Sequence, residues 1–155
     1  MIKLNRILLP TDFSDYSEEA MTYACAFVEQ FGAELHVLHV LQDLVAVVPE
    51  PGVAFPPPGD YMGELQASAE KALLQIPAPD WSANHTVVRA TRQGPPFLEI
   101  VRYAKEFEID LIVIGTHGRG GLAHVLLGSV AEKVVRKAPC PVLTVRPGEH
   151  EFVMP

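Results

Sequence analysis

Short apolar runs alternate with amphipathic stretches along most of the chain. The runs have the length of β-strands, and the stretches between them repeat apolar residues at the three- and four-residue spacing of an α-helix. The pattern predicts five strands, at residues 6–10, 34–41, 85–91, 110–115 and 141–145. It also predicts four helices: one after the first strand, one over about 61–76, and two that start near residues 95 and 128.

The stretch after the first strand shows how these helices are expected to begin and end. Ala20 and Val28 lie on its apolar side. The Asp15-x-x-Glu18 pattern is typical of a capping box, in which two side chains bond the free backbone N–H groups of a helix start. Gly32 is typical of a helix end, because glycine readily adopts the left-handed conformation found there.

Strict alternation of strands and helices predicts an α/β protein with a parallel sheet between two layers of helices. Because crossover connections are right-handed, few topologies remain, and we expect an open, flavodoxin-like sheet in strand order 3-2-1-4-5. The predicted domain covers residues 1–147, with a proline-rich insertion loop at 42–60 and a C-terminal tail at 148–155. Ligands of such sheets bind beyond the carboxyl ends of the strands, here where strands 1 and 4 are neighbours.

The formal net charge of −7 argues against binding to DNA, RNA or anionic lipid, because phosphate-rich polymers and surfaces select basic proteins. The charge is unevenly distributed, however. Residues 115–147 contain five basic side chains and one acidic side chain, so this part of the chain is locally positive. Such a distribution suits a small anionic ligand better than a polymer.

The two cysteines, Cys25 and Cys140, are far apart in the sequence and form no CxxC motif, which is typical of a reducing compartment. The N-terminus lacks the apolar run of a signal peptide, and no apolar stretch reaches membrane-spanning length. We therefore expect a cytoplasmic protein that binds neither nucleic acid nor a membrane.

The loop after the fourth strand is rich in glycine. It runs from Gly115 to Ser129, has four glycines in its first seven residues, and ends in Gly-Ser at a predicted helix start. Glycines let a backbone approach an anion closely, and the free N–H groups and dipole of a helix start favour a phosphate. His117 and Arg119 add side-chain donors. We interpret the loop as a phosphate-binding site rather than as a set of turn-forming glycines.

Other phosphate motifs fit less well. The P-loop motif GxxxxGK[ST] is absent, because no lysine follows a glycine. The segment 118–123 matches GxGxx[GA], but it follows the fourth strand and lacks the downstream acid that would hold a ribose in a dinucleotide site.

Asp12 ends the first strand at the predicted ligand position. It could instead cap the following helix, although Ser14 or Asp15 could equally do so. A receiver domain would also place an acid here, but it needs another aspartate after strand 3, where residues 91–93 are Thr-Arg-Gln, and a lysine after strand 5, where Arg146 stands. We therefore favour a ligand role for Asp12.

Together these segments resemble the ATP-binding universal stress proteins. The spacing Gly115-x2-Gly118-x9-Gly128-Ser129 matches the nucleotide motif of that family. The flanks match as well, with Pro-Thr-Asp-Phe-Ser at 10–14, Leu-His-Val at 38–40 and Ala-Pro-Cys-Pro-Val-Leu-Thr-Val at 138–145. The resemblance covers nearly the whole chain and implies the adenine nucleotide α-hydrolase-like fold. The loop at 42–60 departs from it, since it is longer and richer in proline than usual in the family.

The resemblance implies which residues would hold ATP, or alternatively AMP or ADP. Asp12 would contact the ribose and adenine, Val40 would contact the adenine through its backbone, and Gly115 would lie under the ribose. The phosphates would bind mainly to backbone N–H groups of residues 118–119 and 128–130. The implied nucleotide-binding residues are Pro10, Thr11, Asp12, Val40, Ile114, Gly115, His117, Gly118, Arg119, Gly128, Ser129 and Val130.

No side-chain metal site is expected. His36 and His39 are three apart on a strand and therefore point to opposite faces of the sheet, and His39 is expected to be a packed, hydrogen-bonded residue. His117 and His124 lack further ligands at suitable spacing. Magnesium would arrive with the nucleotide, held by phosphate oxygens and water.

The resemblance also implies a homodimeric regulatory protein of stress physiology, in which the fifth strand pairs with its counterpart. An exposed edge strand of Val142, Leu143, Thr144 and Val145 would need such cover. No catalytic constellation emerges from the sequence, so we expect a binding protein rather than an enzyme. Two alternatives remain: a slow ATPase, and a structural dimerisation module whose site stays empty.

Overall fold

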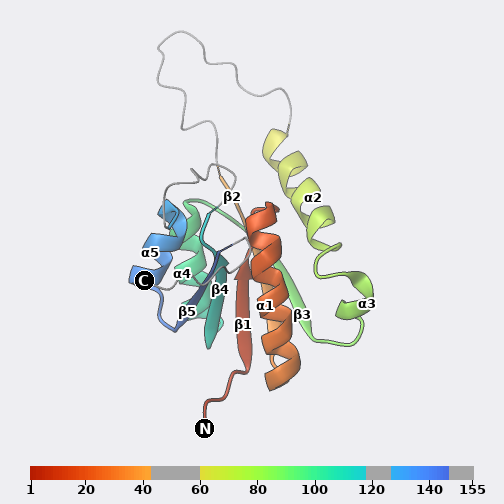
Figure 1. Ribbon diagram of the computed structural model, residues 1–155. Coiled ribbons are helices and arrows are strands. Elements are labelled where there is room, and N and C mark those ends of the chain that lie inside the picture. Colours follow the sequence, from red (N-terminus) through yellow and green to blue (C-terminus); the bar gives the residue numbers. More distant parts are fainter. Residues whose placement is uncertain (43–59, 118–126, 147–155) are drawn as a thin grey trace.

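The computed structural model describes residues 1–42, 60–117 and 127–146. Five parallel strands form one sheet in the order β3-β2-β1-β4-β5, as the sequence predicted. The strands are β1 (Arg6–Pro10), β2 (Glu34–Leu41), β3 (Val87–Gln93), β4 (Leu111–Gly115) and β5 (Val142–Val145). Helices lie on both sides of this sheet, which confirms the three-layer architecture (Figure 1).

The described residues form five helices rather than the four that the sequence predicted. They are α1 (Asp15–Phe31), α2 (Tyr61–Leu73), α3 (Pro79–Ser82), α4 (Pro96–Glu106) and α5 (Ser129–Lys137). The additional helix is α3, a single turn that is too short to show a helical repeat of apolar residues. No helix in the described ranges is long and apolar enough to cross a membrane.

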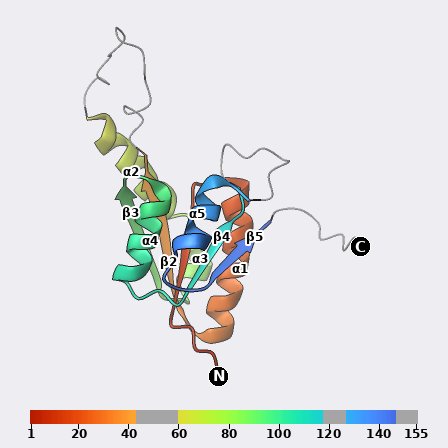
Figure 2. The ribbon, with the colours of Figure 1, turned by 90° about the vertical axis from the view of Figure 1, so that its left-hand side faces the viewer.

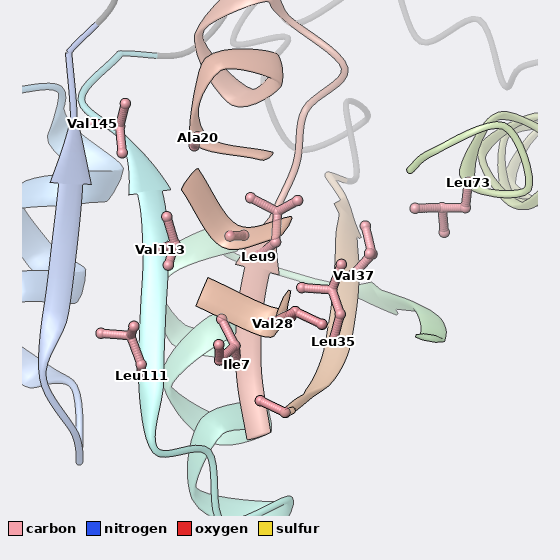
Figure 3. Close-up of a cluster of buried hydrophobic side chains, with 12 residues drawn as sticks. Ile7, Leu9, Ala20, Val28, Leu35, Val37, Leu73, Leu111, Val113 and Val145 are labelled. Atoms are coloured by element: carbon pink, nitrogen blue, oxygen red, sulfur yellow. The ribbon is translucent and has the colours of Figure 1, made fainter. Parts of the chain in front are cut away.

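The central strands are apolar throughout because both of their faces are buried. Successive side chains of a strand point to opposite faces of its sheet. Ile7 and Leu9 therefore pack with α1 and α2, whereas Leu8 packs with α4 and α5. Figure 2 shows α1 and α4 on opposite sides of the sheet. Val113 of β4 lies on the α1 side, and in Figure 3 the side chain of Leu73 approaches the same cluster from α2. Each face of the sheet thus has its own core.

The start of α1 differs from the prediction. The N-cap residue is Ser14, and its side chain makes no capping bond. Instead, Oδ1 of Asp12 accepts hydrogen bonds from the Ser14 N–H group, at 3.0 Å, and from the Ser14 hydroxyl. Asp15 and Glu18 both lie in the first turn, where their charges favour the positive end of the helix dipole. The predicted capping box is therefore wrong, whereas Gly32 ends the helix as predicted, with a φ of 64°.

A buried polar contact links β2 to α4. His36 is 3% exposed, and its Nδ1 lies 2.9 Å from the hydroxyl oxygen of Tyr103. Its Nε2 lies 3.2 Å from a carboxylate oxygen of Glu34, without hydrogen-bond geometry. Burial lowers the pKa of His36; the carboxylate of Glu34 raises it and the charge of Arg6 lowers it further, but burial is the largest effect. A neutral ring with its proton on Nε2 leaves Nδ1 to accept the hydrogen bond from Tyr103.

Because of this contact, we expect His36→Asn to reduce the loss of stability below neutral pH. The pKa of His36 is lower in the folded chain than the ordinary value of 6.5, so the unfolded chain takes up the proton first as pH falls. The stabilising contribution of the neutral ring is complete above that value and declines below it. Asparagine keeps an amide near the position of Nδ1 but binds no proton in this range.

Urea unfolding of both proteins at about pH 7.5 and about pH 5.5, on either side of the ordinary histidine pKa, measures the effect. The wild-type free energy of unfolding should fall more between the two values than that of the variant. An equal or smaller fall in the wild type would contradict the assignment of a neutral, buried histidine.

Candidate functional site

The carboxyl ends of β1 and β4 lie side by side at the centre of the sheet. The two strands pair through Ile7 with Leu111 and Leu8 with Ile112. The residues after them, 11–12 and 116–117, therefore lie at the same edge of the sheet, near the start of α1 (Figure 1). This is the point at which the strand order reverses, and it is where the sequence placed the ligand.

A chain of hydrogen bonds fixes the turn after β1. Thr11 is buried, and its hydroxyl oxygen accepts from the Phe13 N–H group at 3.0 Å. The Ser17 hydroxyl donates to the carbonyl oxygen of Ser14 at 2.8 Å, so it can only accept from Thr11, whose oxygen lies 3.0 Å away. The hydrogens of the Thr11 hydroxyl, the Ser17 hydroxyl and the Phe13 amide are thereby all engaged in hydrogen bonds. The turn holds Asp12, half-buried, at the edge of the sheet.

Asp12 fulfils the alternative role that the sequence offered, since it stabilises the start of α1 through Ser14. Because Asp12 lies two residues after the end of β1, its carboxylate stays near the end of that strand while it makes these bonds. The same side chain therefore orders the turn and presents a charge at the candidate site.

His39 and Phe13 form a second contact across this edge. Nδ1 of His39 lies 2.8 Å from the carbonyl oxygen of Thr11, so this nitrogen carries the proton and donates. The ring of Phe13 lies against the His39 ring, with 4.6 Å between centroids. Phe13 has a φ of 62°, a conformation unusual for a non-glycine residue, which turns the chain away from β1. The predicted packed and hydrogen-bonded role of His39 is confirmed, and it lies on the sheet face opposite to His36.

The backbone of Val40 extends beyond the end of β1. The carbonyl oxygen of Leu38 accepts from the Thr11 N–H group at 2.9 Å, and backbone groups two residues apart on a strand point the same way. The N–H and C=O groups of Val40 therefore point past Thr11, toward the candidate site. Its side chain packs against the core under α4. A polar contact of Val40 with a ligand would therefore use its backbone, and the role that the resemblance implies for it stays a prediction.

Gly115 lies where α1 approaches β4 most closely. A Cβ atom at this position would lie 2.7 Å from the carbonyl oxygen of Tyr16, closer than real Cβ contacts allow. The glycine is thus required by helix packing, a reason independent of any ligand. Thr116 follows, with its hydroxyl oxygen 3.0 Å from Nδ1 of His117, whose ring faces Tyr16 at 5.6 Å.

The start of α5 is tied to the end of β4. The Gly128 N–H group donates to the carbonyl oxygen of Thr116, and a Cβ atom at Gly128 would lie 2.8 Å from the same oxygen. The first bond within the helix runs from the Glu132 N–H group to Gly128. The N–H groups of residues 129–131 precede it and make no hydrogen bond within the described ranges. They point out of the helix start, beside the ends of β1 and β4.

The side chains at the start of α5 leave this end of the helix open to an anion. Ser129 is exposed and its hydroxyl makes no hydrogen bond to described residues. Glu132, the acid in the first turn, pairs with Arg136 one turn further along, at 2.9 Å. The carboxylate is therefore drawn away from the helix start.

The remaining predicted site residues fall into two groups. Pro10 and Ile114 are buried, and Val130 packs against the core under α4 and α5, so these residues can offer only backbone groups. Gly118 and Arg119 lie outside the described residues, as do the loop at 43–59 and the tail from 147. Within the described part of the chain, no group of three or more histidine, cysteine, aspartate and glutamate side chains could hold a metal.

Phe13, Tyr16 and Thr116 contribute to this edge although the sequence did not single them out. Their contacts join different elements, and those of Tyr16 reach residues about a hundred positions along the chain, which no local pattern reports. The threonine at 116 could have been noted because it follows a buried strand, as Thr11 does.

The free edge of β5 lies on the other side of the sheet from β3. The carbonyl oxygens of Pro141 and Val145 accept from β4 and its extension, so the backbone groups of the residues between them alternate in direction. The N–H and C=O groups of Val142 and Thr144 therefore point away from the sheet. Both side chains are half-buried.

A protein-family model described as the universal stress protein family matches residues 3–146. The universal stress protein MJ0531 of Methanocaldococcus jannaschii is 37% identical over 152 residues, which cover 94% of this chain and 84% of that protein. The solved structure of universal stress protein UspA from Lactobacillus plantarum has a TM-score of 0.77 and 30% identity, and it covers 94% of this chain and 100% of its own.

Two more distant structures were solved with nucleotides. One is a universal stress protein in complex with cAMP, with a TM-score of 0.64, which covers 95% of this chain and 100% of its own. The other, from Archaeoglobus fulgidus, is in complex with dAMP, has a TM-score of 0.58, and covers 93% and 98%. Each is 23% identical in sequence to this chain, and at this level the similarity shows a shared fold and nothing further. Since the family model matches nearly the whole chain and a relative shares more than a third of its residues, this protein belongs to the universal stress protein family.

Proposed function

We propose that this protein is a regulatory module that binds an adenine nucleotide, ATP in the first place, at the ends of β1, β2 and β4. The observation that carries this proposal is the start of α5, where three N–H groups with no partner in the described ranges are held next to the end of β4 by the contact between Gly128 and Thr116. Phosphates bind well to such free N–H groups at the positive end of a helix.

The opposite side of the site supports a nucleoside. The backbone groups of Val40 can pair with the edge of a base, and the Asp12 carboxylate can accept from ribose hydroxyls. The complexes of related folds with cAMP and dAMP support adenine as the base. Magnesium, if bound, is held by phosphate oxygens and water, because the described residues supply no cluster of ligands for it.

The proposal also covers the oligomeric state of the protein and its role in the cell. The outward N–H and C=O groups of Val142 and Thr144 would pair with those of a second copy, giving a homodimer through β5. Bound nucleotide would then favour one arrangement of the dimer or of its loops for a protein partner. We place this binding in the cytoplasm and in stress physiology, within a domain that ends near residue 147.

Ser129→Asp should separate nucleotide binding from folding. An added carboxylate at the first residue of α5 stabilises the helix through its dipole but repels a phosphate at the same place. Calorimetric titration of nucleotide-free protein with ATP, with and without magnesium, should show saturable binding that the variant weakens at least about tenfold, or roughly 1.4 kcal/mol.

Ser68→Asp is the matched control, because Ser68 is an exposed residue of α2 and the added charge is the same. It should bind ATP like the wild type, and Ser129→Asp should unfold at or above the wild-type temperature. Equal affinity of Ser129→Asp and the wild type for ATP would contradict the proposed phosphate position. The absence of heat with any adenine nucleotide would favour a dimerisation module with an empty site.

ATP turnover distinguishes the binding module from a slow ATPase. Asp12 already accepts two hydrogen bonds from Ser14, and the described residues place no other carboxylate at this edge to orient a water. Phosphate release from ATP should therefore equal the rate in buffer, for the wild type and for Asp12→Asn alike. Release by the wild type that Asp12→Asn abolishes would instead establish an ATPase.

The dimer can be tested with Thr144→Pro. Proline removes an N–H group that points outward, while the bonds of β5 to β4 use other residues. Light scattering coupled to size exclusion should find a dimer for the wild type and a monomer for the variant. Thr144→Ala keeps the N–H group and should remain dimeric. A dimer that survives Thr144→Pro would place the interface elsewhere.

A further inference from the structure

A groove of about 540 Å³ lies along β3, away from the proposed nucleotide site. It is lined by residues 88–92 of β3, by Leu73 and Leu74 at the end of α2, and by Tyr103 and Phe107 at the end of α4. Successive side chains of a strand point to opposite faces of its sheet, yet residues 88–92 of β3 all line this one groove. The groove therefore follows the free edge of the strand, which lies at the side of the sheet in Figure 2.

Two hydrogen bonds show which backbone groups of β3 face the groove. The Leu35 N–H group donates to Thr86, and the Gly94 N–H group donates to Leu41, so the even-numbered residues of this segment point to β2. Residues 87, 89, 91 and 93 therefore point their N–H and C=O groups outward. These groups make no hydrogen bond within the described ranges. They form a free template for another strand.

The walls of the groove limit what can pair with this edge. α2 stands on one side and α4 on the other, and Leu74 on the α2 wall is 61% exposed. A second copy of the chain would bring the same two walls to the contact, and the helices would meet before the strands could pair. A single extended segment of another protein has no flanking helices of its own, so it can lie between α2 and α4.

The charge of the groove defines the chemistry of such a segment. The Arg89 guanidinium donates to the carbonyl oxygens of Leu73 and Ile76 through Nε, at 2.7 and 3.1 Å, and to the Ser82 hydroxyl through Nη2. Nη1 makes no hydrogen bond, and no carboxylate lies within ion-pair distance in the described chain. Burial lowers the pKa of Arg89 from its ordinary value.

The other charged groups of the groove are already engaged. Arg92 pairs with Glu106 at 3.0 Å and lies over the ring of Tyr103. Glu70, the acid among the lining residues, accepts from the amide of Gln66. Of the two arginines that line the groove, Arg89 is therefore the one without a carboxylate partner in the described chain.

We infer that the β3 edge groove binds an extended acidic segment of a partner protein by strand addition. The segment pairs its backbone with residues 87, 89, 91 and 93. Alternate apolar side chains lie against Leu73 and Leu74, and an acidic side chain on the same face reaches Nη1 of Arg89. Apolar contacts and strand pairing provide affinity, and the carboxylate provides selectivity for acidic sequences.

The test uses a capped heptapeptide, Thr-Val-Thr-Glu-Thr-Val-Thr, and its counterpart with glutamine in place of glutamate. Nuclear magnetic resonance titration of the full chain should give a dissociation constant at least about tenfold lower for the glutamate peptide, since a hydrogen bond between two charges adds this much. Bound peptide should slow the exchange of the amides at 87, 89, 91 and 93, whereas those at 88, 90 and 92 should already be slow.

Two variants address the strand edge and the charge separately. Thr91→Pro removes an outward N–H group and leaves the bonds to β2 intact, so it should fold and lose both peptides. Arg89→Gln should bind the two peptides equally. Lys105→Gln is the matched control, because it removes an exposed cation of α4 that does not line the groove, and it should bind like the wild type.

Three results would overturn the inference. One is equal affinity of the wild type for the glutamate and glutamine peptides. Another is peptide binding that survives Thr91→Pro in a folded protein. The third is a change of oligomeric state on Thr91→Pro, which would identify the edge as an interface between copies of this chain.

Discussion

The candidate site depends on two close contacts between backbone atoms at the end of β4. Gly115 lies under the carbonyl oxygen of Tyr16, and Gly128 lies against the carbonyl oxygen of Thr116. Both neighbours are backbone atoms, so neither can rotate away from a larger residue. These contacts set how closely α1 approaches the sheet and where α5 begins. The position of the turn at 11–17 and of the first N–H groups of α5 follows from them.

The central part of the fold could be predicted from the sequence because its residues are buried on both faces. The predicted bounds of β1 and β2 agree with the structure, since continuous apolar runs leave little choice of position. β3 is an edge strand whose residues are half-buried, except for the exposed Gln93, and include Arg89 and Arg92. Its polar residues hide the pattern, and the prediction of 85–91 lies two residues before the observed strand. Similarly, α2 ends at Leu73 rather than near residue 76, because Pro77 and the short α3 follow.

The location of the candidate site could also be predicted, whereas its internal contacts could not. Strand order and the glycine motif together point to the ends of β1 and β4. Composition alone cannot show that Gly115 and Gly128 are also required by packing, or that Phe13 adopts a positive φ. The pairing of His36 with Tyr103 joins residues 67 positions apart and stabilises a layer away from the site. Long-range contacts of this kind depend on the assembled fold rather than on any local pattern.

The two edges of the sheet differ in a way that bears on how large an assembly can grow. A flat sheet with two accessible edges can add further sheets without limit, which is the geometry of a fibre. Here α2 and α4 stand on either side of β3, whereas no described helix lines the edge of β5 in the same way, so β5 is the edge better placed to meet another whole sheet. Once two copies have paired through β5, a further copy would have to pair with a β3 edge that lies between α2 and α4, so growth by strand pairing stops at two copies. The walls of the β3 edge groove thus act together with Arg89 and Arg92 of that strand to oppose polymerisation.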